Sequence, residues 1–238
     1  MRELICGLYI ILYTWITAPQ RYKNIKGSDE KKIKEGYAKN YKIIQGMARG
    51  ILKISGANLH IQGKENLSQK EAAVYMGTHK SYMDIVIMIA LVDAPLIFIA
   101  KSELKTLPFL STWVKTVGGI YIDRDDIRQS FRVIVEAIEM LERGYSIAIF
   151  PEGTRSKGSE LGDFKAGSFK LATKANVPIV PIAMGNTFKL LEEARRLRPA
   201  KIRVNVGQVI DVPNLSKEQK QTISGDTQKY IQELLNQA

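Results

Sequence analysis

Cysteine and histidine are scarce in this chain, whose 238 positions include one cysteine and two histidines. A single thiol, Cys6, excludes an intrachain disulfide and a cysteine-based zinc cluster. The sequence also lacks the Walker, Gly-x-Gly-x-x-Gly, His-Glu-x-x-His and Gly-x-Ser-x-Gly patterns. Nucleotide hydrolysis, hydride transfer, zinc proteolysis and a covalent acyl-enzyme therefore have no motif to support them, and we expect neither a metal nor a cofactor.

No long hydrophobic run is present. The longest uncharged apolar segment, residues 4–18 (LICGLYIILYTWITA), stops at Pro19, whereas a membrane span requires roughly 18 or more such residues. A segment of this length suits a helix that lies in the membrane interface or dips into one leaflet. A signal peptide is the alternative, because Arg2 precedes the run, but no small-x-small cleavage site follows it.

Acidic residues are outnumbered, with 24 Asp and Glu against 35 Lys and Arg, and the formal charge of +11 predicts an anionic partner. Ten of the cations lie in residues 21–53, directly after the apolar segment. Lysines beside a membrane-embedded helix gain about 1 kcal/mol each from anionic headgroups, although an ordinary solvated helix face is the alternative. We expect residues 1–53 to form a membrane-associated helical segment with a basic collar. Residues 4–18 and the basic segment would hold the protein at the cytoplasmic face of the cell membrane.

Residues 54–238 have the pattern of one α/β domain. Short apolar runs alternate with helical stretches, and several runs are apolar throughout, as in strands that helices cover on both faces. We therefore expect a mixed, largely parallel sheet flanked by helices. The predicted strands are residues 57–62, 72–76, 96–100, 119–122, 146–150, 179–184 and 202–206. Pro178 and Pro181 predict that the sixth is an edge or bulged strand, because proline cannot donate to a ladder.

Two helices are predicted most clearly. The first covers residues 126–144, with Asp126 as its cap and Gly144 as its end. Its apolar stripe consists of Phe131, Ile134, Ile138 and Leu141. The second opens at Ser216, where Ser216 and Gln219 have the spacing of a capping box.

The first candidate site is GTHKSYMDI, residues 77–85, which places His79 and Asp84 five positions apart. In an uninterrupted α-helix the two side chains would differ by about 140° around the axis and could not pair. They can meet if His79 lies in the turn after a strand and Asp84 in the first turns of a helix that starts near Ser81. The carboxylate would then leave the second imidazole nitrogen as a base near neutral pH. Alternatively, His79 caps the helix and Asp84 pairs with Lys80.

A second candidate segment, FPEGTRS, covers residues 150–156 and follows a predicted strand. Ligands of open α/β sheets bind where strands end and loops converge. Gly153 would allow the backbone to approach a ligand closely, and Arg155 offers a planar fork of donors for phosphate oxygens. A tight turn in which Glu152 and Arg155 are bridged is the alternative.

A third segment, residues 101–126, contributes three cations that follow predicted strands. Lys101 and Lys105 are one helical turn apart, and Arg124 ends the run GIYI. These side chains could converge on one anion. Alternatively, Arg124 pairs with a neighbouring aspartate, at position 123 or 125.

Four blocks, THKSYMD, KSELKTLPFLSTWVKTVGGIYIDR, FPEGTRS and VPIVPIA, occur in the order shown by the glycerolipid acyltransferases. With the stretch FKAGSFKLA, they make residues 50–210 resemble that family, and especially its bacterial lysophosphatidic acid acyltransferases. The sequence departs from the family pattern at Thr78, where asparagine is frequent, and at residues 111–112, where a Gly-Trp pair is frequent.

The resemblance implies transfer of a fatty acyl group from an acyl thioester, either acyl-CoA or acyl-carrier protein, to the free hydroxyl of 1-acyl-sn-glycerol 3-phosphate, giving phosphatidic acid. His79 would be the general base, and Asp84 would orient it. The family pattern assigns binding of the glycerol phosphate to Arg124, Glu152, Gly153, Thr154 and Arg155, with Lys101 and Lys105 as weaker candidates. The apolar fourth block would form a wall beside the acyl chain.

Three alternatives remain open at this point. The acceptor could be glycerol 3-phosphate or a different lysophospholipid. A hydrolase would use His79 to activate water on a lipid ester or thioester. A non-enzymatic binder of membranes or nucleic acid would explain the positive charge, but no basic-aromatic recognition motif is present and we expect no nucleic-acid partner.

Overall fold

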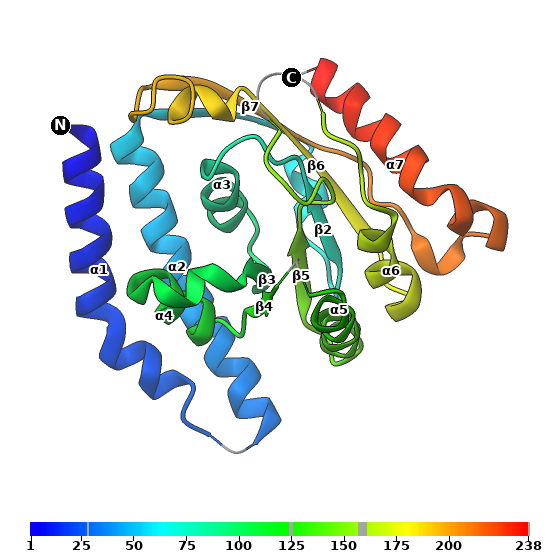
Figure 1. Cartoon of the computed structure of the whole chain (residues 1–238), viewed down its shortest axis with the longest axis horizontal. Helices are drawn as coiled ribbons and strands as arrows, with labels where there is room; N and C mark the ends of the chain where they lie inside the picture. The colour runs from blue at the N-terminus through cyan, green and yellow to red at the C-terminus, as the bar shows by residue number, and fades with distance from the viewer. Residues whose placement is uncertain (28, 124–125, 157–160, 238) are drawn as a thin grey trace.

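The computed structural model describes residues 1–27, 29–123, 126–156 and 161–237. A seven-stranded sheet lies between two layers of helices (Figure 1). Its strands are β1 (Ala57–Gln62), β2 (Val74–Gly77), β3 (Leu96–Lys101), β4 (Ile120–Ile122), β5 (Ser146–Ile149), β6 (Ile179–Gly185) and β7 (Ala200–Val206). One layer contains α1 (Arg2–Asn24), α2 (Glu30–Ser55), α3 (Met83–Leu91) and α4 (Pro108–Thr116), and the other contains α5 (Ile127–Glu142), α6 (Ala166–Ala175) and α7 (Lys217–Asn236).

The strand order is β1-β7-β6-β2-β5-β3-β4. Every neighbouring pair is parallel except β6 and β7, which are antiparallel. Val74, Tyr75 and Met76 of the central strand β2 are fully buried. Helices cover both faces of this strand, which explains why its sequence is apolar at successive positions. The predicted mixed, largely parallel sheet flanked by helices is confirmed.

Strand β6 carries Pro181 inside the sheet, between β2 and β7, so the predicted edge position is wrong. Ile182 pairs with Val206, and Ile179 forms a bridge with Ile210. Two residues on the β6 side therefore oppose three on the other side, which is a bulge. The additional residue lies in residues 207–209, opposite β6, so the ladder is irregular beside Pro181 although the bulged segment is the partner and not β6 itself.

Helix α2, which contains most of the basic segment, is part of the folded domain. Its side chains Tyr41, Ile44, Met47 and Ile51 are buried in the core on one side of the sheet. The lysines occupy the rest of the helix surface, so the same helix is both a structural layer and a source of positive charge. The structure therefore shows no separation between the core and the predicted appendage at residue 53.

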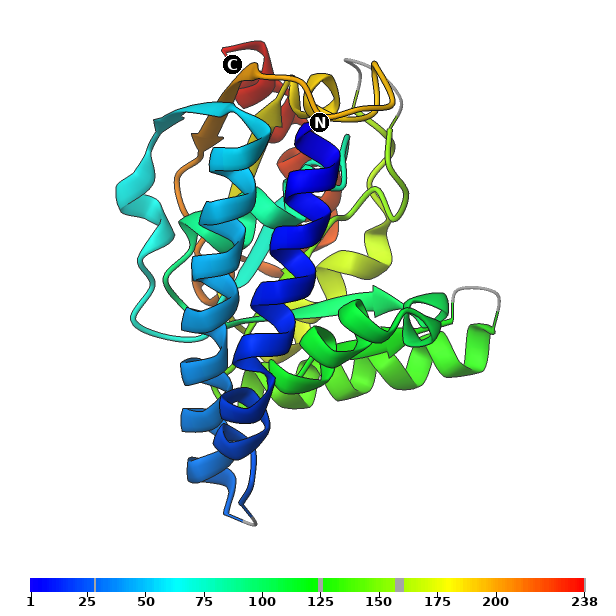
Figure 2. The same ribbon diagram turned by 90° about the vertical axis from the view of Figure 1, so that its left-hand side faces the viewer.

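Helix α1 lies alongside α2 (Figure 2) and continues through Pro19 to Asn24. The two helices approach closely at Gly50, where an added Cβ would lie 2.2 Å from the hydroxyl oxygen of Tyr9. Tyr13 fixes the pairing further, because its hydroxyl donates to the carbonyl of Ile43 at 3.0 Å. Among the described residues, no helix is both long enough and apolar enough to cross a bilayer.

Helix α5 buries a different stripe from the predicted one. Val133, Ala137 and Leu141 are buried against the sheet, whereas Phe131 is 69% exposed. Phe131 lies about 120° around the helix axis from Ala137, so it points away from the sheet. The predicted stripe is wrong at Phe131, while the predicted cap is confirmed, because the side chain of Asp126 accepts a bond from the first turn.

Candidate active site

Several of the candidate residues lie at one edge of the sheet. Strands β2, β3, β5 and β6 run in the same direction, so the loops that follow them begin at the same edge. His79 lies two residues after β2, and residues 150–156 follow β5 directly. Lys101 ends β3, and Glu192 lies in the segment after β6. The sheet topology thus assembles segments that are far apart in the sequence.

His79 and Asp84 lie within hydrogen-bonding distance, with Nδ1 of the imidazole 3.3 Å from Oδ2 of the carboxylate. The carboxylate is fully buried, and the same Oδ2 accepts the backbone N–H groups of Lys80 and Ser81, each at 2.6 Å. Helix α3 begins at Met83, two residues later than expected, and Asp84 lies in its first turn. The turn and helix predicted from the sequence therefore bring the two side chains together.

The backbone of His79 is fixed by the loop after β5. Its N–H donates to Oε1 of Glu152 at 2.6 Å, and its carbonyl accepts the N–H of Ser156 at 2.8 Å and the hydroxyl of Ser156 at 3.3 Å. The imidazole stacks on the ring of Phe150, with centroids 4.2 Å apart. With Nδ1 directed at Asp84, Nε2 is the ring nitrogen that can take a proton from a ligand. The ring remains 15% exposed, so a ligand can reach it.

Glu152 is a buried residue with two backbone partners. Its side chain accepts the N–H of His79 through Oε1 and the N–H of Gly162 through Oε2, the latter at 3.0 Å. Burial lowers the pKa of the nearby Lys80, and the negative charges of Glu152 and Asp84 oppose this shift. The carboxylate thus links the two loops and helps to balance Lys80, whereas the resemblance implied contact with the acceptor.

Arg155 belongs to a cluster that joins three loops. Its guanidinium lies over the ring of Tyr82, 3.7 Å from the centroid, and Nη2 donates to the Tyr82 hydroxyl at 3.0 Å. Nη1 donates to Oε1 of Glu192 at 3.3 Å. The same oxygen of Glu192 accepts the backbone N–H of Tyr82 at 2.9 Å. Arg155 is therefore bridged to Glu192. The alternative that the sequence left open, a bridge between Glu152 and Arg155, is wrong.

The other two candidate residues of the FPEGTRS segment, Gly153 and Thr154, lie in the same loop. Gly153 has a φ of +73°, which favours glycine, and an added Cβ would lie 2.9 Å from Cε of Lys165. Thr154 is exposed next to it. Both belong to the loop whose Glu152 and Ser156 bond to the backbone of His79.

The predicted cations of the third segment are more dispersed. Lys101 forms an ion pair with Glu103 at the end of β3. Lys105 lies in the short 3₁₀-helix at Ser102–Thr106, with Nζ 5.1 Å from the ring centroid of Tyr121. Arg124 lies outside the described residues.

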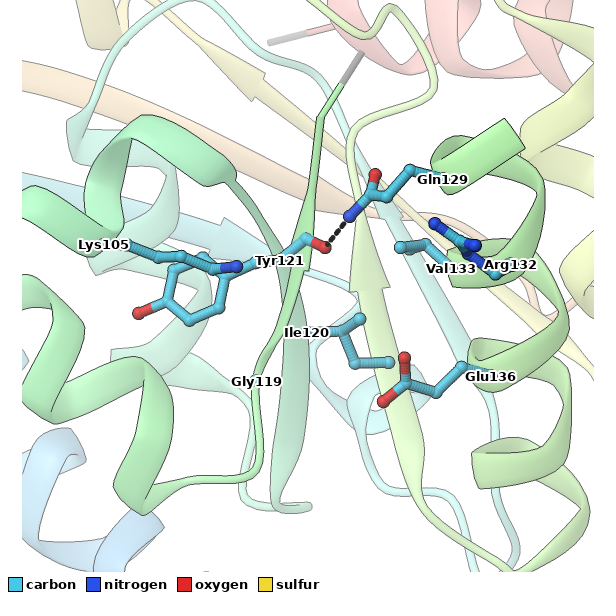
Figure 3. A pocket seen from close by; sticks show the side chains of 8 residues that line it. All are labelled: Lys105, Gly119, Ile120, Tyr121, Gln129, Arg132, Val133 and Glu136. Carbon is cyan, nitrogen blue, oxygen red and sulfur yellow. Dashed lines mark hydrogen bonds between the residues drawn. The ribbon is translucent and has the colours of Figure 1, made fainter. Parts of the chain in front are cut away.

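Lys105 faces a pocket of about 480 Å³ between β4 and α5 (Figure 3). Tyr121 lies beside Lys105, and the side chains of Gln129, Arg132 and Glu136 line the opposite wall. Gln129 donates to the carbonyl of Tyr121 at 3.0 Å and thereby covers part of the free edge of β4. The lining includes neither His79 nor any residue of 150–156, so this pocket is separate from the candidate site.

Four residues of the site were not singled out from the sequence. Phe150 and Ser156 are the first and last residues of the segment FPEGTRS, so their place in a candidate segment was a usable signal. Tyr82 lies between His79 and Asp84 and offered the same signal. Glu192 had none, because the segment that contains it resembles an ordinary charged helix end.

A histidine held by a buried carboxylate, at the edge where parallel strands end, is typical of an α/β enzyme that uses a general base. The family model described as Acyltransferase matches residues 58–185 of the chain. The chain is 33% identical over 183 residues to the 1-acyl-sn-glycerol-3-phosphate acyltransferase of Borreliella burgdorferi, an alignment that covers 75% of this chain and 73% of that protein. The chain therefore belongs to the acyltransferase family.

Two further similarities agree with this assignment. The 1-acyl-sn-glycerol-3-phosphate acyltransferase of Escherichia coli is 30% identical over 162 residues, which are 68% of this chain and 66% of that protein. The crystal structure of the 1-acyl-sn-glycerophosphate (LPA) acyltransferase PlsC from Thermotoga maritima matches with a TM-score of 0.72 and 24% identity over 98% of both chains. The latter shows that the fold is shared along the whole chain.

Proposed function

We propose that this acyltransferase transfers a fatty acyl group from an acyl thioester to the free hydroxyl of 1-acyl-sn-glycerol 3-phosphate, giving phosphatidic acid. The relatives from B. burgdorferi and E. coli are named for this acceptor. The observation that carries the mechanism is the contact of 3.3 Å between His79 and the buried Asp84, in a loop that Glu152 and Ser156 hold from the other side.

The proposed reaction is direct transfer within a complex of both substrates. Nε2 of His79 takes the proton of the acceptor hydroxyl while the oxygen attacks the thioester carbonyl. The C–O ester bond forms, the C–S bond breaks, and the departing thiolate takes the proton from the imidazolium, which restores the neutral imidazole. Asp84 stabilises the imidazolium that forms in between, and the two N–H groups on Oδ2 keep that carboxylate in place. Acyl-CoA and acyl-carrier protein both fit this chemistry as donors.

Arg155 is the proposed main contact for the acceptor phosphate. A guanidinium binds phosphate oxygens through two parallel donors. The residue after Arg155, Ser156, bonds to the carbonyl of His79, so the cation and the base belong to connected loops. Gly153 and Thr154 lie on the same loop and are proposed as backbone and hydroxyl contacts.

Helix α1 is the proposed membrane contact. It directs one apolar face away from the protein, and each member of that face is 44–76% exposed. The face consists of Leu4, Ile5, Leu8, Ile11, Leu12, Trp15 and Ile16. Helix α4 lies beside α1 (Figure 1) and adds exposed Phe109 and Leu110, while its Trp113 donates to Thr14 of α1 at 2.8 Å. An exposed apolar surface of this kind, on helices that do not span a bilayer, suits attachment to one leaflet.

An assay with purified protein tests the proposed reaction. Thioester loss is measured with and without lysophosphatidic acid, with both donor types, and the lipid product is identified. Formation of phosphatidic acid that depends on the acceptor supports the proposal. Equal thioester loss without any acceptor would identify a hydrolase, and preference for glycerol 3-phosphate would reassign the acceptor.

Vesicle flotation tests the membrane contact. The double variant Leu12→Ser/Trp15→Ser should bind vesicles of mixed neutral and anionic phospholipid at least about tenfold more weakly, because each exposed apolar side chain contributes on the order of 1 kcal/mol or more when buried in lipid. Phe131→Ser is the control, because Phe131 is a large apolar residue that is 69% exposed, between the values of 47% for Leu12 and 76% for Trp15, and it belongs to α5 in the opposite helical layer. A contact specific to α1 would be refuted if both variants lost binding equally, or if neither variant lost binding.

A further inference from the structure

Glu192 places a carboxylate where the structure offers a site for an anion. Oε1 of this residue receives one donor from the guanidinium of Arg155 at 3.3 Å and one from the backbone N–H of Tyr82 at 2.9 Å. The guanidinium is positioned independently of Glu192, because it also lies over the Tyr82 ring and donates to the Tyr82 hydroxyl. The donors would therefore remain together if the carboxylate moved away.

These donors are the kind that bind a phosphate monoester. Arg155 supplies a charged, planar fork, and Tyr82 is the residue that precedes the first turn of α3, where backbone N–H groups attract anions. The site also adjoins the proposed base. Tyr82 follows His79 by three positions, and Ser156, next to Arg155, bonds to the His79 carbonyl.

Glu192 does not use its own hydrogen-bonding capacity fully. Its second oxygen, Oε2, is buried, and no group among the described residues bonds to it. The contact with Arg155 is formed through a single N–O pair and not through a bidentate fork. The two side chains are 25% and 34% exposed, so solvent and a ligand can reach the pair. A carboxylate held in this way can be displaced more easily than one whose two oxygens are both paired.

We propose that Glu192 is an internal competitor for the acceptor phosphate. In the free enzyme its carboxylate occupies the anion site of Arg155 and Tyr82. A phosphate monoester takes over these donors when it binds, and Glu192 turns toward solvent. Glu192 thereby weakens acceptor binding and discriminates against ligands whose negative charge is too small to displace it. This inference rests on the proposed function, because it takes the acceptor phosphate as the ligand of Arg155.

The test compares Glu192→Gln with Glu193→Gln. Both variants lose one negative charge, but Glu193 is an exposed neighbour for which the structure gives no side-chain contact with Arg155, so it is the matched control. In Glu192→Gln we expect the KM for lysophosphatidic acid to fall about 3- to 10-fold, as the loss of a partly exposed ion pair would allow. The kcat and the KM for the donor should change less than twofold, and Glu193→Gln should resemble the wild type.

Direct binding separates this inference from the proposed function. Isothermal titration with glycerol 3-phosphate should show a tighter Kd in Glu192→Gln than in the wild type, by the same factor as the KM, and thermal unfolding should confirm that the variant is folded. A KM that rises, or a Kd that is unchanged in the folded variant, would overturn the competitor and make Glu192 a support for Arg155. If the wild type binds the phosphate monoester but does not acylate lysophosphatidic acid, the proposed function fails while the anion site stands.

Discussion

The two sides of the candidate site are built differently. On the side of the base, the N–H, the carbonyl and Nδ1 of His79 each have a partner, and the partners Asp84 and Glu152 are buried. On the side of the cations, Arg155 and Lys101 are 34% and 51% exposed, and each is paired with a carboxylate that is itself partly exposed.

This difference suits the roles that we propose for the two sides. A general base works only if its nitrogen stays within hydrogen-bonding reach of the proton that it removes, so its position has to be fixed before the substrate arrives. A cation that captures phosphate can exchange one anion for another, and partial exposure makes that exchange possible. The rigid side and the exchangeable side meet at Ser156, which follows Arg155 and holds the carbonyl of His79.

Removal of the base should have the largest effect. His79→Ala is expected to lower kcat by about 10² to 10⁴, the range that general-base catalysis usually contributes. The backbone bonds of His79 do not depend on its side chain, so vesicle binding and the unfolding temperature should stay close to those of the wild type. Steady-state kinetics of the purified variant are the measurement. Turnover within a few-fold of the wild type would show that the rigid side of the site does not serve catalysis.

Removal of the main cation should act on binding. Arg155→Ala is expected to raise the KM for the acceptor about 10- to 100-fold, because a charge-assisted contact contributes about 1.5 to 3 kcal/mol, while the KM for the donor is unchanged. Lys105→Ala is the matched control, since it removes the same charge from the separate pocket between β4 and α5. A larger effect at Lys105 than at Arg155 would move the phosphate site to that pocket.

The local part of this architecture was predictable from the sequence. Strands such as β2 and β5 were readable as short apolar runs, and β1 and β7 contain polar residues that alternate with apolar ones. The capping box of Ser216 and Gln219 is present as its spacing indicates. The meeting of His79 and Asp84 followed from a turn and a helix start within six residues. In the last two cases, the residues that contact one another lie within six positions of each other in the sequence.

The long-range part was not predictable in the same way. The sequence offered Glu152 as a contact for the acceptor or, alternatively, as a partner of its neighbour Arg155. Its partner in the structure, the backbone of His79, lies 73 positions away. Tyr82 and Glu192 are 110 positions apart. Such contacts depend on which strands become neighbours in the sheet, and apolar periodicity does not specify strand order. The burial of α2 could have been predicted from the sequence. Its buried face has helical spacing among the lysines of the same segment and consists of Tyr41, Ile44, Ala48 and Ile51.

A substitution of Glu152 tests whether the buried contacts around His79 serve to hold the base in position. Glu152→Gln keeps one carbonyl oxygen, which can accept the N–H of His79 or that of Gly162 but not both, and its NH₂ group must then face a donor. Because an unsatisfied buried donor costs about 1 to 3 kcal/mol, the position of His79 should loosen. We expect kcat to fall about tenfold with the acceptor KM within about twofold, measured by steady-state kinetics.

Ser156→Ala provides the graded comparison for Glu152→Gln. It removes the hydroxyl contact of 3.3 Å with the His79 carbonyl but keeps the backbone contact of 2.8 Å, so kcat should fall less than about threefold. The pH dependence of kcat should shift in Glu152→Gln if the imidazole moves relative to Asp84, whereas a purely structural defect would lower kcat equally at every pH. If Glu152→Gln instead raises the acceptor KM and leaves kcat unchanged, Glu152 contacts the substrate directly, and the division between a fixed base and an exchangeable anion site is wrong.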